Sequence, residues 1–364
     1  MTLGFLVSRF SPAVYKGENS CPNGLALTPL QSFLKQTPPD EVKRLQKPEN
    51  ASEYERKYKW EFGTGPNGEE MCRIPERFVN KYEHPAQYMI QGTTSYGMNL
   101  DGHDGSESFP AEICAHENFK SPSGEAGIDN QLFRAEGCLG YYRGSATDPS
   151  IEGAIVTYYN RMINEGLHSI VIEVTGVDNL LNDDDVVFGI YSSPDKGYLV
   201  NKKLMPHLTY TTTEKSKWRH EVPAKIVDGI IKTDVFDLLL NMEWAIGGDK
   251  GANEEYDMRR ARFELVIQPN GELKGLMGAY QDIYNVYSLF RSVGSGVSAV
   301  ASVDCAAEYK ALQAMADASP DPKTGRCSAI SLAYEVEAVP GFIVHPEGMP
   351  SRNGKKMVLA EPAQ

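Results

Sequence analysis

The chain has 364 residues, of which 41% are hydrophobic and 23% are charged, and its formal net charge is −13. This is the composition of a globular protein of one large or two ordinary domains. Basic residues adjoin only in pairs, so the clustered positive charge that a nucleic-acid partner requires is missing. No stretch approaches 18 consecutive apolar residues, and we therefore expect no membrane-spanning segment.

Residues 1–80 are polar and rich in turn signals, which predicts a long, loop-rich N-terminal arm. A short helix is expected from Pro38 to about Gln46, because Asp40 and Glu41 suit a first helical turn. The apolar run in residues 1–10 is too short for the core of a signal peptide. If the protein is exported, we expect its signal to be absent from this sequence.

Residues 81–147 form a second region, dense in Gly, Asp and His, that cannot bury enough apolar surface to order itself. Oxygen-bearing side chains concentrate between Asn99 and Glu107, and hard cations such as Ca²⁺ prefer such ligands on a tightly turning chain. A solvated turn is the commoner outcome for a loop of this kind, and the pattern is a poor EF-hand. The candidate metal ligands are Asn99, Asp101, His103, Asp104, Glu107 and His116.

The same region offers imidazoles for a transition metal. His84, His103 and His116, with the thiol of Cys114, are ligand types that zinc and copper accept. The histidines lack a paired spacing, and Cys114 is better suited to a disulfide. A metalloenzyme with a histidine-based site therefore stays the third of our hypotheses.

From residue 148 to 345 the hydrophobic period predicts a folded core. A helix is expected from about Ile151 to Ile163, where apolar residues recur at helical spacing. After His168 the period changes to two, and short strands follow between turns. Strands are expected at 170–175, 185–192, 198–200, 208–213, 224–233, 236–244, 260–268, 273–280 and 329–339, and helices at 282–293 and 304–316.

This succession of short strands favours a mainly β fold, which we interpret as an antiparallel β-sandwich of the jelly-roll or lectin-like kind with a few peripheral helices. We divide the chain into the arm (1–80), the Gly/Asp/His-rich region (81–147), the sandwich (148–345) and a polar tail (346–364). No motif is specific enough to indicate a known family.

The six cysteines are the clearest indication of compartment. They fall into three successive pairs, each closing a stretch rich in Gly and Pro, which predicts a disulfide framework and a periplasmic or secreted protein. On that spacing we expect Cys114 to pair with Cys138. The other expected pairs are Cys21 with Cys72 and Cys305 with Cys327.

Other motifs are weaker. The acidic run between Asp178 and Asp185 is typical of a solvated hairpin loop. Gly294–Ala299 matches G-x-G-x-x-A, but a helix precedes it, where a dinucleotide site requires a strand. Tyrosines number 19, and they cluster at Tyr141-Tyr142, at Tyr158-Tyr159 and from Tyr280 to Tyr287. Such side chains are enriched at sugar-binding and protein interfaces.

No nucleophile motif is present, so we expect a binding or structural protein rather than an enzyme. The first hypothesis is an exported, disulfide-stapled protein that binds a carbohydrate or other protein subunits, with calcium as a structural cofactor and no nucleotide. The alternative is a secreted glycan hydrolase, because two carboxylates can converge from distant strands without a sequence signature.

Overall fold

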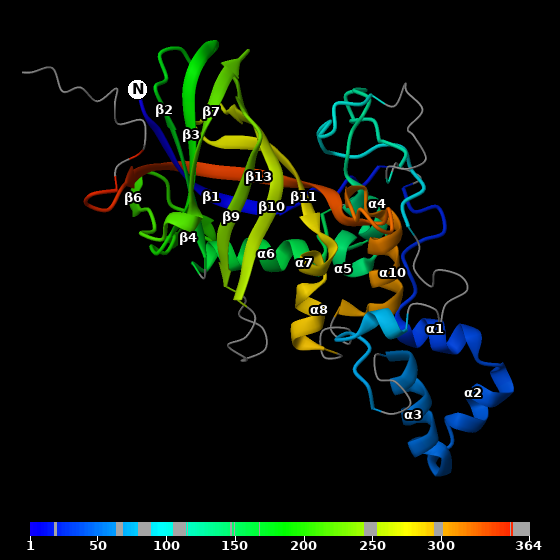
Figure 1. Cartoon of the computed structure of the whole chain (residues 1–364). Coiled ribbons are helices and arrows are strands. Elements are labelled where there is room, and N and C mark those ends of the chain that lie inside the picture. The colour runs from blue at the N-terminus through cyan, green and yellow to red at the C-terminus, as the bar shows by residue number, and fades with distance from the viewer. Residues whose placement is uncertain are drawn as a thin grey trace, which may run out of the picture.

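The computed structural model describes residues 1–17, 20–62, 68–78, 89–104, 114, 116–145, 148, 150–166, 168–243, 253–294, 301–349 and 351. Within these ranges eight strands close into an antiparallel barrel, in which each strand pairs with the next and β13 returns to β1 (Figure 1). In order around the barrel they are β1 (Leu3–Pro12), β2 (Ser169–Thr175), β3 (Asp183–Ser193), β7 (Arg219–Val227), β8 (Ile230–Thr233), β10 (Asn253–Ile267), β11 (Leu273–Asp282) and β13 (Cys327–Val344).

The expected β-sandwich is therefore wrong, although the expectation of a mainly β protein is confirmed. A strand with one buried face has the same alternating pattern in a sandwich and in a barrel. What makes this fold a barrel and not a sandwich is the pairing of β1, which is bonded to β2 on one side and to β13 on the other. Phe5 lies opposite both Ile172 and Pro340, and this pairing removes the free edges that a sandwich would leave.

Other strands extend the barrel locally. The upstream half of β10 leaves the barrel and pairs with β9 (Phe236–Glu243), with a register shift between Met258 and Ala261. β13 carries two short partners, β6 (Leu208–Thr211) in parallel and β12 (Ala318–Pro320) in antiparallel pairing. A separate hairpin consists of β4 (Leu199–Val200) and β5 (Lys203–Leu204).

The barrel interior is filled by side chains. Along β2 the inward residues Ile170, Ile172 and Val174 are fully buried, and Phe188 from β3 stacks near Phe263 from β10 at 5.0 Å between ring centroids. Burying an aliphatic or aromatic side chain of this size stabilises the fold by roughly 1.5–3 kcal/mol. The side chains inside the barrel make up most of the hydrophobic core. A cavity large enough for a small molecule lies at one end of the barrel.

Helices cover that end. α6 (Ala154–Asn164) packs against β1, and α4 (Gln131–Glu136), α5 (Gly140–Arg143), α7 (Ile283–Val286), α8 (Ser288–Val293) and α10 (Cys305–Met315) gather beside it (Figure 1). Asn130 caps α4 and Asp304 caps α10, each accepting backbone N–H groups of the first turn. The remaining helices, α1 (Pro29–Gln36), α2 (Pro39–Leu45) and α3 (Ala51–Phe62), extend away from the barrel.

All six cysteines form disulfides, but not in successive pairs. Cys21 pairs with Cys138, Cys72 with Cys305 and Cys114 with Cys327, at sequence separations of 117, 233 and 213 residues. The predicted local pairings are therefore wrong, because the barrel brings distant segments together and sequence spacing carries no information on this. Three disulfides indicate an oxidising, extracytoplasmic environment. Within the described ranges, no helix has the length and apolar character needed to cross a bilayer.

Candidate functional site: a tyrosine-lined cavity at the barrel mouth

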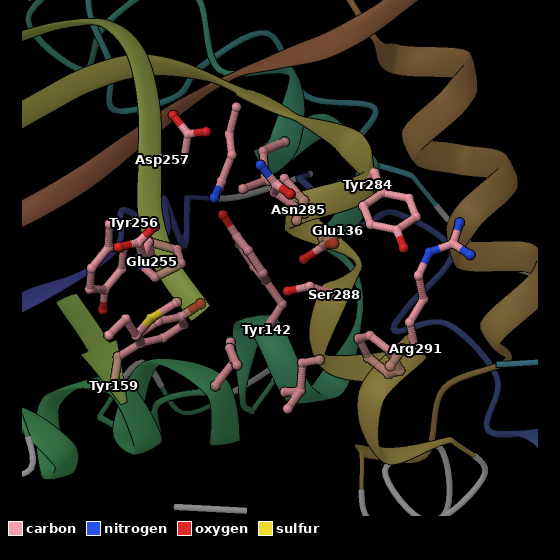
Figure 2. A pocket seen from close by; sticks show the side chains of 18 of the residues that line it. Glu136, Tyr142, Tyr159, Glu255, Tyr256, Asp257, Tyr284, Asn285, Ser288 and Arg291 are labelled. Carbon is pink, nitrogen blue, oxygen red and sulfur yellow. The ribbon is translucent and has the colours of Figure 1, made fainter. Parts of the chain in front are cut away.

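A cavity of about 470 Å³ lies where the barrel meets the helices. Ligand pockets in proteins commonly measure 300–1,000 Å³ and often occupy barrel mouths. One wall comes from the ends of β1, β9, β10, β11 and β13, and the other from α4 to α8. Figure 2 shows Glu255, Tyr256 and Asp257 on one side, Tyr284 and Arg291 on the other, and Tyr142 and Glu136 between them.

Two tyrosine hydroxyls beside this cavity lack a protein partner. Tyr142 on α5 and Tyr256 on β10 are each 1% exposed, and neither hydroxyl forms a hydrogen bond within the part of the chain that the structure describes. Burial raises the pKa of both phenols well above its ordinary value, so both remain neutral O–H groups. Both side chains belong to the lining of the cavity (Figure 2), but neither hydroxyl oxygen is exposed to it.

A pair of buried carboxyl groups adjoins the cavity. Glu136 at the end of α4 is 5% exposed and lines the cavity, and Glu308 on α10 is 1% exposed behind it. The hydroxyl of Tyr141 lies 2.8 Å from an oxygen of each. A phenol carries only one proton, so it donates to one carboxylate and must accept from the other, protonated carboxyl.

The environment of this pair explains its protonation. Burial raises the pKa of Glu136 to about 7 and that of Glu308 well above its ordinary value, and hydrogen bonds from Tyr141 only partly offset the effect. The two carboxyls are also hydrogen-bonded to each other. At neutral pH the pair therefore holds at least one proton, and its first ionisation places a negative charge at the cavity wall.

Disulfides hold both helices that carry the pair. Cys138 follows Glu136 by two residues and is bonded to Cys21. Cys305 lies one helical turn before Glu308 and is bonded to Cys72. The cross-links tie the chain just after α4 and the first residue of α10 to the segments that contain Cys21 and Cys72.

Two further carboxylates face the cavity from β10, and each is already neutralised. Glu255 accepts from the Nζ of Lys217 at 2.6 Å and from the indole Nε1 of Trp218 at 2.6 Å. Asp257 lies 3.0 Å from the Nε of Arg259. These ion pairs leave the charge of both groups compensated.

Arg291 on α8 contributes the guanidinium that lines the cavity. It forms an ion pair with Glu76 and lies over the ring of Tyr284, with 4.3 Å between its Cζ and the ring centroid. Its charge is therefore engaged by the protein. Glu255 and Asp257 each have a basic partner, so Glu136 is the described cavity carboxyl for which no ion pair with a lysine or arginine is found among the described residues.

The loop predicted to bind calcium lies elsewhere and is ordered by its own hydrogen bonds. Asn99 Oδ1 accepts from the N–H of Gly102, and Asp101 Oδ1 accepts from that of His103, both at 2.7 Å. Asp129 Oδ2 accepts from the N–H of Leu100 at 2.6 Å. Asn99 Oδ1 and Asp101 Oδ1 therefore each accept a backbone hydrogen bond from within the loop.

The remaining predicted ligands are not brought together in the described ranges. The Nε2 of His116 lies 3.1 Å from the carbonyl of Ala316, and the carbonyl of His103 accepts from Asn99 and from Asn118. Asp104 lies beside Gly127, whereas His84 and Glu107 lie outside the described residues. No group of three or more His, Cys, Asp or Glu side chains suited to a metal occurs among the residues described. Calcium and the histidine-based metal site stay predictions.

Sequence reasoning identified some cavity residues without identifying the cavity. It noted the clusters Tyr141-Tyr142 and Tyr158-Tyr159 as unusual. It did not connect them to Tyr256 or to Glu136, because β10 and α4 become neighbours only through the closed barrel. The one available signal was the density of tyrosines itself.

Three comparisons with known proteins, covering family models, curated proteins and solved structures, found no match.

Proposed function

We propose that this is an extracytoplasmic, disulfide-stabilised binding protein that takes a small polar organic molecule into the cavity at the barrel mouth. The observation that carries the proposal is the cavity itself, about 470 Å³ in volume and lined by aromatic and polar side chains from the barrel and the helices.

The wall chemistry supports an organic ligand. Aromatic rings from Tyr142, Tyr159, Tyr256 and Phe290 offer flat apolar surface, while Gln281, Asn285 and Ser288 offer polar groups. A predominantly apolar wall with a few convergent polar groups is the usual construction of a small-molecule site. A bound carbohydrate, which the tyrosines led us to expect from the sequence, belongs to this class.

A ligand-observed NMR screen tests the proposal with a library of sugars, amino acids, amines, nucleosides and organic acids. The variant Ser288→Trp places an indole in the cavity and should abolish binding of the true ligands. Thr157→Trp, an exposed position on α6 that does not line the cavity, is the matched control and should leave binding unchanged. Circular dichroism verifies that both variants fold. A screen without hits, or hits that survive Ser288→Trp, contradicts the proposal.

Glycan hydrolysis is the second candidate, and one observation favours it. Burial raises the pKa of Glu136 to about 7, so this carboxyl can act as a proton donor at neutral pH, as acid catalysts in glycosidases do. Glu255 and Asp257 line the opposite wall, but each of them is held in an ion pair. Turnover of a glycan panel that disappears in Glu136→Gln would establish this activity, and a silent panel would eliminate it.

A further inference from the structure

We propose that the ligand of the barrel-mouth cavity is an organic cation, a primary ammonium compound with a small apolar body, and that Glu136 recognises its nitrogen. The inference rests on the proposed binding function and names the class of ligand.

The first argument is charge. The cavity wall contains three described carboxyl groups, and two of them have basic partners: Glu255 has Lys217, and Asp257 has Arg259. Glu136 has only the neutral hydroxyl of Tyr141 and the second carboxyl group of Glu308. A buried negative charge is expensive unless a cation or hydrogen bonds compensate it. An ammonium group in the cavity supplies both.

The second argument is the kind of hydrogen bond that the wall can form. An ionised carboxylate only accepts hydrogen bonds, whereas an ammonium group carries up to three donors and no acceptor, which matches Glu136. Hydrogen bonds in which a partner is charged are roughly twice as strong as neutral ones.

The third argument is the aromatic lining. Tyr142, Tyr159, Tyr256 and Tyr284 border the cavity, and faces of tyrosine rings attract cations within about 6 Å. The same rings pack against an apolar body attached to the nitrogen. A volume of about 470 Å³ accommodates a single ring or a short chain with an amino group, not a macromolecule.

The site implies that the affinity for an ammonium ligand rises with pH. The titratable groups that face Glu136 are Tyr141 and Tyr142 on α5, Glu308 on α10 and Tyr334 on β13, and Asp304 faces Glu308. The tyrosines stay neutral, so the carboxyl pair is the part that titrates. With the first ionisation near pH 7, ammonium binding favours the ionised form, and affinity should rise about tenfold from pH 6 to pH 8.

Calorimetry of the wild-type protein tests this without any variant. The probes are benzylamine, whose alkylammonium group stays protonated across this range, and benzyl alcohol as its neutral counterpart. We expect benzylamine to bind at least tenfold more tightly than benzyl alcohol at pH 8. Titrations in buffers of different ionisation enthalpy should reveal release of about half a proton at pH 7.

Variants of single residues show which side chain is responsible for benzylamine binding and for its pH dependence. Glu136→Gln should weaken benzylamine binding about ten- to a hundredfold and abolish its pH dependence. Thr157→Trp should bind as the wild type does.

The outcomes separate the inference from the proposed function. If benzyl alcohol binds as well as benzylamine, or affinity for the amine does not rise with pH, the ammonium assignment is overturned. If the library yields cavity ligands that are all neutral or anionic, the assignment also fails while the binding function stands. If no compound of any class binds in the cavity, both fail together.

Discussion

The carboxyl groups of Glu136 and Glu308 share one hydrogen-bonding partner, the hydroxyl of Tyr141, which lies 2.8 Å from an oxygen of each. The contact joins α4 and α5, which are neighbours in sequence, to α10, which follows much later in the chain. Since a single hydroxyl proton cannot serve two carboxylates, the arrangement requires a proton on the pair. It therefore couples the packing of three helices to the ionisation of a group at the cavity wall.

The variant Tyr141→Phe removes the shared hydroxyl and leaves both carboxyls buried without it. We expect the free energy of unfolding to fall by about 1–3 kcal/mol at pH 7, because buried acceptors lose a hydrogen bond. Urea denaturation measures the change. Tyr198→Phe, at a tyrosine that is 62% exposed, should change it by less than about 0.5 kcal/mol. Equal effects in the two variants would contradict the role of the shared hydroxyl.

A second prediction concerns how the stability of the fold depends on pH, and it rests on Asp317, which lies just before β12. Burial raises its pKa from 3.8 to about 7, although the backbone N–H of Ser331 donates to it at 2.7 Å. The folded protein therefore holds a proton there that the unfolded chain releases near pH 4. Stability contributed by this group is complete below about pH 4 and is lost as pH rises to 7.

Asp317→Asn mimics the protonated form and should be insensitive to this loss. We expect the variant to exceed the wild type in unfolding free energy by a few kcal/mol at pH 8 and to match it near pH 4. His168, whose pKa burial lowers to about 4, affects wild type and variant alike and cancels in the difference. A difference that does not grow between pH 4 and pH 8 would refute the assignment.

The strands after residue 168 were predictable because alternating burial is a local property. β2, β3, β9 and β11 lie where the period of two placed them, and the turn at Gln268–Glu272 joins β10 to β11 as expected. The helix after residue 148 begins at Ala154 instead of Ile151. Gly153 provides its N-cap, where a Cβ would lie 2.1 Å from the carbonyl of Tyr142.

Closure of the barrel was not predictable, because it depends on pairing at long range. β1 lies in the segment interpreted as a loop-rich arm, and its alternation over Leu3–Pro12 was not recognised as a strand. The same limit explains the disulfides: Cys72 and Cys305 meet because the barrel brings the segment at 68–78 to the start of α10. The cavity could not be predicted for the same reason. Glu136 and Tyr256 belong to elements that are distant in sequence and become neighbours only in the closed fold.

Gly275 on β11 provides a test of the pairing between β10 and β11. A Cβ at this position would lie 2.0 Å from the carbonyl oxygen of Glu264 on β10, so Gly275→Ala must displace backbone. We expect a loss of about 1–3 kcal/mol or more in unfolding free energy. Gly140→Ala is the matched control, since its nearest neighbour would be Leu25 Cδ1 at 3.9 Å. Thermal unfolding of both variants decides, and an unperturbed Gly275→Ala would contradict this β10–β11 pairing.

The last prediction concerns the disulfide beside the carboxyl pair. Replacing Cys72 and Cys305 by Ala, or Cys114 and Cys327 by Ala, opens loops of similar length, 233 and 213 residues apart in sequence. Each double variant should therefore lose a similar stability, about 2–5 kcal/mol. Only the first removes the anchor one turn before Glu308.

Hydrogen exchange separates the two effects. In Cys72→Ala/Cys305→Ala we expect faster exchange at the amide of Glu308, which donates to the carbonyl of Asp304 in the first turn of α10, beyond what the global loss of stability explains. In Cys114→Ala/Cys327→Ala that amide should follow the global change alone. If both variants expose it equally, the Cys72–Cys305 bond stabilises the chain in general and does not position the carboxyl pair.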